Sequence, residues 1–341
     1  MRLFSAFTHR YLLSVLSLAG ASFSLSTTSI PVGTVPGRIA VNQTTNRIYV
    51  TNLNSNNVSV IDGESDTVIA TVPVGMSPSD VGINSVTNLV YVASSLANSV
   101  SVIDGTSNTV VATIPGLKDP LRLSVNAVTN EVFVANSGSN SVSVIDGSSN
   151  TIVATIPVGS EPAGVRANSA TNLIYVANLN SGTISVIDGQ SDTVTNTFTL
   201  PQPANPGNVA LDPITNELLV TDGFNSKVYV INASSGALLG TITGSGKLPF
   251  APPTGIVEFQ LGRSALVSFS SINGLMLISD SSYTILAGLK SGNGPVGIAV
   301  NRTTGKVYVT QINDGTVIVY TGLFGMKSVT PPGKDRAPGP R

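Results

Sequence analysis

The sequence predicts an all-β fold, a seven-bladed β-propeller with four antiparallel strands in each blade. Two observations support this prediction: a unit of about 42 residues recurs seven times, and each clear unit contains four strand-like runs separated by turn residues. Four short strands in a repeat of this period are typical of a propeller blade. The composition agrees, because Val, Ile and Thr suit pleated sheets, Asn and Gly favour turns, and only 10% of the residues are charged.

Three positional markers define the seven units. Each unit opens with a proline, at Pro36, Pro78, Pro120, Pro162, Pro206, Pro253 and Pro295. An aromatic or aliphatic residue follows 13 positions later, at Tyr49, Tyr91, Phe133, Tyr175, Leu219, Leu266 and Tyr308. The third marker, 26 positions after the proline, comprises Asp62, Asp104, Asp146, Asp188, Asn232, Ser279 and Thr321. A single register across all seven units predicts an array of equivalent blades.

The turns of the first unit separate expected strands at 38–42, 47–51, 58–61 and 67–74. The first turn, 42–46, has the pattern Asn-x-x-Thr-Asn, in which Asn bonds its own backbone and tolerates a left-handed conformation. The third turn begins at the marker Asp. We expect its carboxylate to accept hydrogen bonds from the turn amides rather than to bind a ligand.

The two ends of the repeat array predict how the ring closes. Residues 29–33 match the fourth strand of other units but precede the first unit, and the seventh unit has only three clear strands. We therefore expect 29–33 to form the outer strand of the last blade within a propeller domain at 27–325. The alternative candidate for this strand is 326–329.

The N-terminal residues 1–21 are predicted to be a signal peptide. Arg2 and Arg10 accompany an apolar run at 11–25, with small residues at 19–21. Export to the periplasm, the cell surface or the medium is the expectation, and an uncleaved membrane anchor is the alternative. The remaining chain has no apolar run of membrane length. We also expect the protein to be a monomer. Residues 326–341, rich in Pro and Gly, predict a disordered tail.

Five repeats carry a recurring string in their second expected strand. The strings are Ile48-Tyr-Val-Thr-Asn52, Val90-Tyr-Val-Ala-Ser94, Val132-Phe-Val-Ala-Asn136, Ile174-Tyr-Val-Ala-Asn178 and Val307-Tyr-Val-Thr-Gln311. They resemble the repeat of YVTN-family β-propellers, a likeness that covers residues 27–322. Units five and six depart from it, since Asn232 and Ser279 replace the marker Asp. The resemblance implies a propeller exported to the periplasm or cell surface, and it transfers no catalytic residue.

The residue types that are absent disfavour several functions. The chain has no Cys, and its single histidine, His9, lies in the predicted signal peptide. The expected mature chain therefore lacks the usual general base and the commonest transition-metal ligand, which disfavours the familiar histidine-dependent propeller enzymes. We expect no cofactor and no metal site. Weak binding of single-stranded nucleic acid is a remote alternative, because the chain has no Trp, a net charge of −1 and no basic stripe.

Charged residues gather around the opening prolines of the early units, where propeller loops meet the axis. Arg38, Asp80 and Arg122 each lie two positions after the proline in three consecutive units, where later units have Gly or Asn. Glu258 replaces an aliphatic residue on an inner strand, and a buried carboxylate needs a partner. The full set of candidate ligand-binding residues at this axial mouth is Arg38, Asp80, Lys118, Asp119, Arg122, Glu161, Arg166 and Glu258.

These residues support two interpretations of the mouth. In one, Arg38 and Arg122 are guanidinium forks for a small anion or for a protein partner that presents a carboxylate or phosphate. In the other, the arginines and aspartates pair with each other and fix the blade contacts. The preferred function is an exported, non-catalytic binding or scaffolding module at the cell envelope. The alternative is a hydrolase or lactonase-like enzyme that uses carboxylates and arginine instead of histidine.

Overall fold

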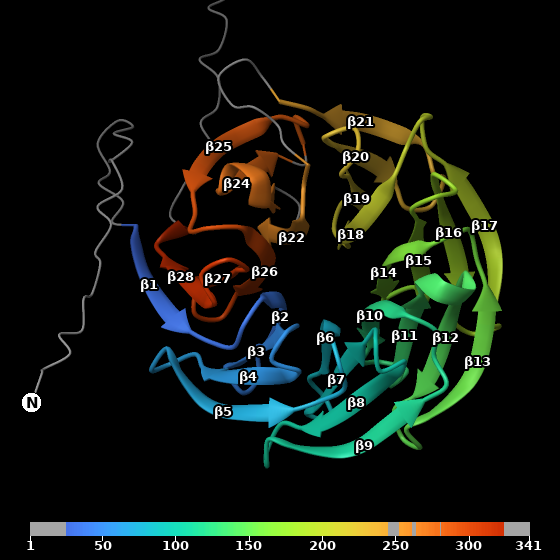
Figure 1. Ribbon diagram of the computed structural model, residues 1–341. Helices are drawn as coiled ribbons and strands as arrows, with labels where there is room; N and C mark the ends of the chain where they lie inside the picture. The colour runs from blue at the N-terminus through green and yellow to red at the C-terminus, as the bar shows by residue number, and fades with distance from the viewer. Residues whose placement is uncertain (1–24, 245–251, 261–263, 280, 324–341) are drawn as a thin grey trace, which may run out of the picture.

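The structure is a computed structural model that describes residues 25–244, 252–260, 264–279 and 281–323. The 28 strands of these residues form seven four-stranded antiparallel sheets, arranged as blades around a central axis (Figure 1). The predicted seven-bladed β-propeller is therefore confirmed. The two helices in the described residues are single 3₁₀ turns of three residues, η1 (Ser137–Ser139) and η2 (Ser270–Ile272), which are far too short to cross a membrane.

Each blade runs from an inner strand at the axis to an outer strand at the circumference. The first blade contains β2 (Pro36–Asn42), β3 (Arg47–Asn52), β4 (Asn57–Asp62) and β5 (Thr67–Pro73), and the second contains β6 (Pro78–Asn84), β7 (Leu89–Ser94), β8 (Ser99–Asp104) and β9 (Thr109–Pro115). The third blade contains β10 (Pro120–Asn126), β11 (Glu131–Asn136), β12 (Ser141–Asp146) and β13 (Thr151–Pro157). The fourth contains β14 (Pro162–Asn168), β15 (Leu173–Asn178), β16 (Thr183–Asp188) and β17 (Thr193–Thr199). The fifth and sixth are β18 (Pro206–Asp212), β19 (Glu217–Asp222), β20 (Lys227–Asn232) and β21 (Leu238–Ile242), then β22 (Gly255–Gln260), β23 (Ser264–Phe269), β24 (Gly274–Ser279) and β25 (Ile285–Lys290).

The seventh blade joins the two ends of the array. It contains β26 (Pro295–Asn301), β27 (Lys306–Gln311) and β28 (Thr316–Thr321), and its outer strand is the N-terminal β1 (Ser26–Pro31). β1 pairs antiparallel with β28, with Ser26 opposite Thr321 (Figure 1). Closure by an N-terminal strand is thus confirmed, although the strand begins and ends earlier than the expected 29–33. The alternative segment 326–329 lies outside the described residues.

The aromatic marker of each unit packs between neighbouring blades. Tyr49 on β3 is fully buried and shares a hydrophobic cluster with Val81 and Val90 of the second blade. Tyr91 contacts the third blade through Leu123 in the same way. Burial between sheets explains why this position is aromatic or aliphatic in every unit.

The turn residues also link the blades. Asn42 accepts hydrogen bonds from the backbone of Thr44 and Thr45, and Asn46 has a left-handed φ of 54°, as predicted. The Nδ2 of Asn42 donates to Oδ1 of Asn88 in the next blade at 2.8 Å. The same inter-blade bond recurs in Asn84–Asn130, Asn126–Asn172 and Asn301–Asn46. The hairpin Asn therefore stabilises both its own turn and the ring.

Candidate functional site at the axial mouth

The seven inner strands enclose a cavity of about 350 Å³ on the propeller axis. Residues from β2, β6, β10, β14, β18, β22 and β26 all line it. A cavity of this size is at the lower end of the roughly 300–1,000 Å³ typical of small-molecule sites. The ring of inner strands thus forms one site to which every blade contributes.

Strand register divides the cavity into layers. The layer nearest the start of the inner strands, which we call the mouth layer, contains Arg38, Asp80, Arg122, Gly164, Asn208, Gly255 and Gly297. Arg166 lies two residues after Gly164 on β14, and residues i and i+2 of a strand face the same way. It therefore belongs to the next layer, roughly 7 Å deeper by the rise of a strand.

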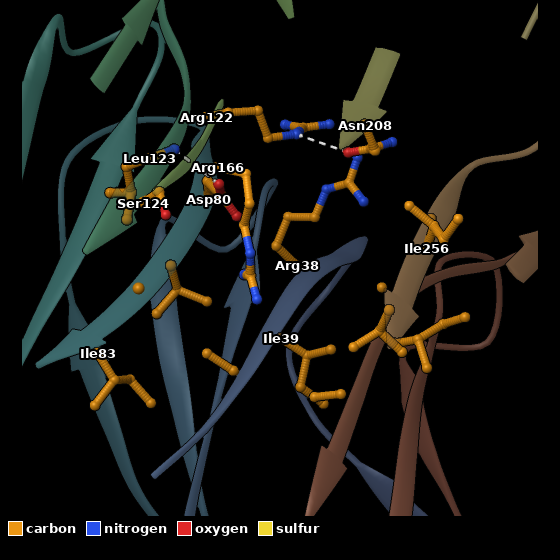
Figure 2. A pocket seen from close by; sticks show the side chains of 18 of the residues that line it. Arg38, Ile39, Asp80, Ile83, Arg122, Leu123, Ser124, Arg166, Asn208 and Ile256 are labelled. Atoms are coloured by element: carbon orange, nitrogen blue, oxygen red, sulfur yellow. Dashed lines mark hydrogen bonds between the residues drawn. The ribbon is translucent and has the colours of Figure 1, made fainter. Parts of the chain in front are cut away.

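Arg122 reaches across the mouth layer from the third blade to the fifth. Its Nε donates to Oδ1 of Asn208 at 3.3 Å (Figure 2). Its Nη1 donates to the carbonyl oxygens of Leu121, at 2.8 Å, and Ser79, at 3.2 Å. These contacts hold the guanidinium plane over the cavity.

Arg38 reaches toward the same point from the first blade. Its Nη1 donates to the carbonyl of Thr254 at 3.2 Å, and Nδ2 of Asn208 donates to the same carbonyl at 3.1 Å. Figure 2 shows the Arg38 and Arg122 guanidinium groups beside Asn208 at one end of the cavity. Two cations from different blades therefore converge on one neutral amide.

Asp80 is the single carboxylate of the mouth layer. Its Oδ2 accepts a hydrogen bond from the backbone of Leu123 at 2.9 Å, and it forms no ion pair with Arg38 or Arg122 among the described residues. Burial raises the pKa of Asp80, and the charges of Arg122 and Arg38 oppose that rise. Even when ionised, this carboxylate can neutralise only one of the two guanidinium groups.

The two arginines remain cations at neutral pH. Burial, reinforced by the nearby charge of Arg122 and opposed by Asp80, lowers the pKa of Arg38 to about 9. Burial also lowers the pKa of Arg122, and Asp80 opposes it. The mouth layer, whose charged side chains are half-buried, therefore carries an excess of at least one positive charge.

The deeper layer has a different charge balance. Arg166 is accessible to solvent inside the cavity (Figure 2), yet the surrounding protein lowers its pKa, while the negative charge of Glu258 acts in the opposite direction. Arg302, in the turn after β26, donates from Nη2 to the Glu258 carbonyl at 2.7 Å. Burial lowers the pKa of Arg302, and the negative charges of Glu258 and Asp212 oppose this decrease. Two acidic residues, Glu258 and Asp212, thus oppose the positive charges of Arg166 and Arg302.

The structure brings four of the candidate residues together in the cavity: Arg38, Asp80, Arg122 and Arg166. Glu258, 3% exposed, lies behind the lining on β22. Lys118, Asp119 and Glu161 lie in loops outside the lining; Ser137 donates to Asp119, and Asn180 donates to Glu161. No group of three or more acidic or histidine side chains in the described residues is placed to hold a metal ion.

The glycines of the mouth layer have a packing role. A Cβ on Gly164 would collide with the carbonyl oxygen of Gly207, and a Cβ on Gly255 with that of Val296. The inner strands of neighbouring blades approach too closely there for any side chain. The charged residues are consequently confined to blades one to three, with Asn208 facing them.

Asn208, Thr254 and Arg302 are functional candidates that the sequence did not single out. Asn208 occupies the same position after the proline as Arg38 and Arg122, and this shared position is the signal that could have identified it. Thr254 contributes only a backbone carbonyl, and Arg302 lies in a turn where a charge is expected on the surface. Sequence alone gave no signal for these two.

Comparison with known protein families and with curated protein sequences found no match. Among solved structures, a chain of Kuenenia stuttgartiensis hydrazine synthase is similar, with a TM-score of 0.76 and 17% sequence identity. The alignment covers 84% of this chain and 95% of that chain. At this identity the similarity establishes the β-propeller fold alone.

Proposed function

We propose that the protein is an exported, non-catalytic binding module of the cell envelope, and that its axial mouth binds an anionic group. The group would be a carboxylate or phosphate of a small ligand or of a partner protein. The observation that carries this proposal is the convergence of Arg38 and Arg122 around a neutral Asn208, with Asp80 as the only carboxylate in the layer.

The mouth has donors available for an anion. Among the described residues, Nη2 of Arg38 and Nη2 of Arg122 have no hydrogen-bond acceptor. The Arg122–Asn208 and Arg38–Thr254 contacts, at 3.3 and 3.2 Å, are long compared with the roughly 2.7–2.9 Å of a charge-assisted bond. A bound carboxylate would form stronger bonds and would offset the excess positive charge.

The envelope location and the YVTN-type identity are supported by sequence features. The apolar run and basic residues of 1–21 are those of a signal peptide. The five recurring strings all fall on the second strand of their blades, β3, β7, β11, β15 and β27. Fractionation of bacteria expressing the chain with and without residues 1–21 tests the location: export only of the longer form is expected, and equal retention of both forms inside the cell would refute it.

Isothermal titration of the folded protein with acetate and with inorganic phosphate tests the binding site. Arg38→Gln/Arg122→Gln should weaken binding at least tenfold, because it removes both guanidinium groups. Lys118→Gln is the matched control, since it removes one positive charge from an exposed loop outside the cavity. Wild-type affinity in the double variant, with an intact circular dichroism spectrum, would overturn the proposal.

A further inference from the structure

We infer that the axial cavity binds a small dicarboxylate lengthwise, with one carboxylate on Arg38 and Arg122 and the other on Arg166. This inference rests on the proposed anion binding at the mouth and specifies the class of ligand. Three features of the cavity support it: the charge of its lining, the unpaired donors of Arg166, and the small side chains in the layer around Arg166.

The lining of the cavity carries more positive than negative charge. Among the described residues that line it, Arg38, Arg122 and Arg166 are the cations and Asp80 is the one carboxylate. An ionised Asp80 offsets one of the three guanidinium charges and leaves two. A ligand with two carboxylates would offset both, whereas a monocarboxylate would leave one guanidinium group without a counter-charge.

Arg166 presents its guanidinium group to the cavity. The side chain is exposed, and in the described part of the chain it has no hydrogen-bond acceptor and forms no ion pair. Glu258 acts on it through its charge, but Glu258 is 3% exposed and lies behind the lining. The guanidinium fork of Arg166 can therefore accept a carboxylate from the cavity side.

The two cationic groups lie at different depths. Figure 2 shows the Arg166 side chain directed along the cavity, away from the end where the Arg38 and Arg122 guanidinium groups lie beside Asn208. Its layer is roughly 7 Å deeper than the mouth layer by the rise of a strand. A ligand that contacts both layers must therefore carry its two carboxylates at opposite ends of a short chain.

Small residues surround Arg166 in its layer. The residues at the equivalent register position on β2, β6, β10 and β26 also line the cavity, and they are Ala40, Gly82, Ser124 and Ala299. None of them carries a charge or fills the axis with a long side chain. The cavity of about 350 Å³ thus has room for a ligand beside the Arg166 guanidinium.

The larger aliphatic residues next to the mouth layer face away from the ligand. Ile39, Val81 and Leu123 are each less than 10% exposed and belong to hydrophobic clusters between blades. The arginines and Asp80, by contrast, are half-buried or exposed. Charged groups rather than hydrocarbon therefore form the recognition surface, which favours a ligand with acidic ends.

Isothermal titration with two matched pairs of anions tests this inference. The pairs are butyrate with succinate and hexanoate with adipate, and acetate reports on the mouth alone. In at least one pair the dicarboxylate should bind at least fivefold more tightly, because its second carboxylate forms charge-assisted hydrogen bonds to Arg166. A smaller gain in both pairs would refute the ligand class, and acetate binding would then still support the anion site. Failure of every anion to bind would overturn the proposed function itself.

Arg166→Gln tests the placement of the second carboxylate. This variant should bind the dicarboxylate no more tightly than the matched monocarboxylate, and its acetate affinity should stay within threefold of the wild type. Lys118→Gln, which removes a positive charge outside the cavity, should keep the full dicarboxylate gain. A gain retained in Arg166→Gln would contradict the inference. So would a loss of acetate binding with an intact circular dichroism spectrum, because Arg166 would then belong to the mouth site.

Discussion

The Nε of Arg122 donates a hydrogen bond to Oδ1 of Asn208 at 3.3 Å, and this bond joins the third blade to the fifth at the mouth of the cavity. Asn208 in turn shares the Thr254 carbonyl with Arg38. The neutral amide of Asn208 thus lies where a carboxylate would offset the positive charge of the Arg38 and Arg122 guanidinium groups. The side chain at position 208 therefore controls the charge of the mouth layer.

The carboxylate introduced by Asn208→Asp should occupy the anion site in place of a ligand. The new carboxylate would accept from Arg122 and lie close to Arg38, so we expect the thermal midpoint to rise by about 2–4 °C. Acetate affinity should fall at least tenfold. Asn208→Ala, which removes the bond without adding charge, should lower the midpoint and retain acetate binding. Because Asn208→Asp also loses the hydrogen bond from Nδ2 to the Thr254 carbonyl, acetate affinity is the decisive measurement. Unchanged acetate affinity in Asn208→Asp would show that the mouth has no excess positive charge.

Asp80→Asn should have the opposite effect on binding. The amide oxygen can still accept from the Leu123 backbone, but the negative charge that opposes the two arginines is lost. We expect acetate to bind several-fold more tightly, with a stronger dependence on ionic strength. Weaker acetate binding measured by titration would mean that Asp80 contributes to the site directly.

Ile30→Ala tests the closing strand. Ile30 on β1 is 3% exposed and belongs to the core between the first and last blades, so its truncation should cost about 2–4 kcal/mol. Ile69 on β5, also an outer strand, is 45% exposed, and Ile69→Ala should cost less than about 1 kcal/mol. Urea unfolding measures both changes. Equal effects would contradict a structural role for β1.

The marker aspartates predict an acid-dependent loss of stability. The Ser65 and Glu64 amides, with the Arg47 side chain, lower the pKa of Asp62 to about 2, and turn hydrogen bonds lower the pKa of Asp104 and Asp146. A depressed folded-state pKa stabilises the protein above the ordinary value near 4, and this contribution is lost as the pH falls toward 2. Thermal midpoints should therefore decline over that interval.

The triple variant Asp62→Asn/Asp104→Asn/Asp146→Asn should show a flatter decline than the wild type between about pH 4 and pH 2. An amide oxygen keeps part of the turn bonding without titrating. Parallel pH profiles of the two proteins would assign the acid sensitivity to other groups.

Sequence predicted the fold well because its determinants are local and repeated. The Asn42 turn, the Tyr49 position and the Asp62 turn each specify a feature that one blade can form and that its neighbours reproduce. Closure by β1 followed from the missing fourth strand of the last unit. None of these required knowledge of distances between blades.

The site was less predictable because it depends on the ring as a whole. Arg38 and Arg122 could be placed in one layer from their shared register, but the bond from Arg122 to Asn208 depends on the width of the cavity. Asp119 and Glu161 are close to the prolines in sequence, yet both adopt a left-handed backbone, with φ of 48° and 54°, in loops outside the cavity. Proximity to the repeat marker therefore did not place a side chain on the axis.

A crystal structure of the protein with 6-bromohexanoate tests the central claim most directly, because bromine can be located by its anomalous scattering. We predict the carboxylate between Arg38 and Arg122, with the bromine peak within one ligand length of both guanidinium groups. The Arg38→Gln/Arg122→Gln protein, treated identically, should show neither. A peak elsewhere on the wild-type protein with an empty mouth, or the same peak in the double variant, would contradict an anion site at the axial mouth.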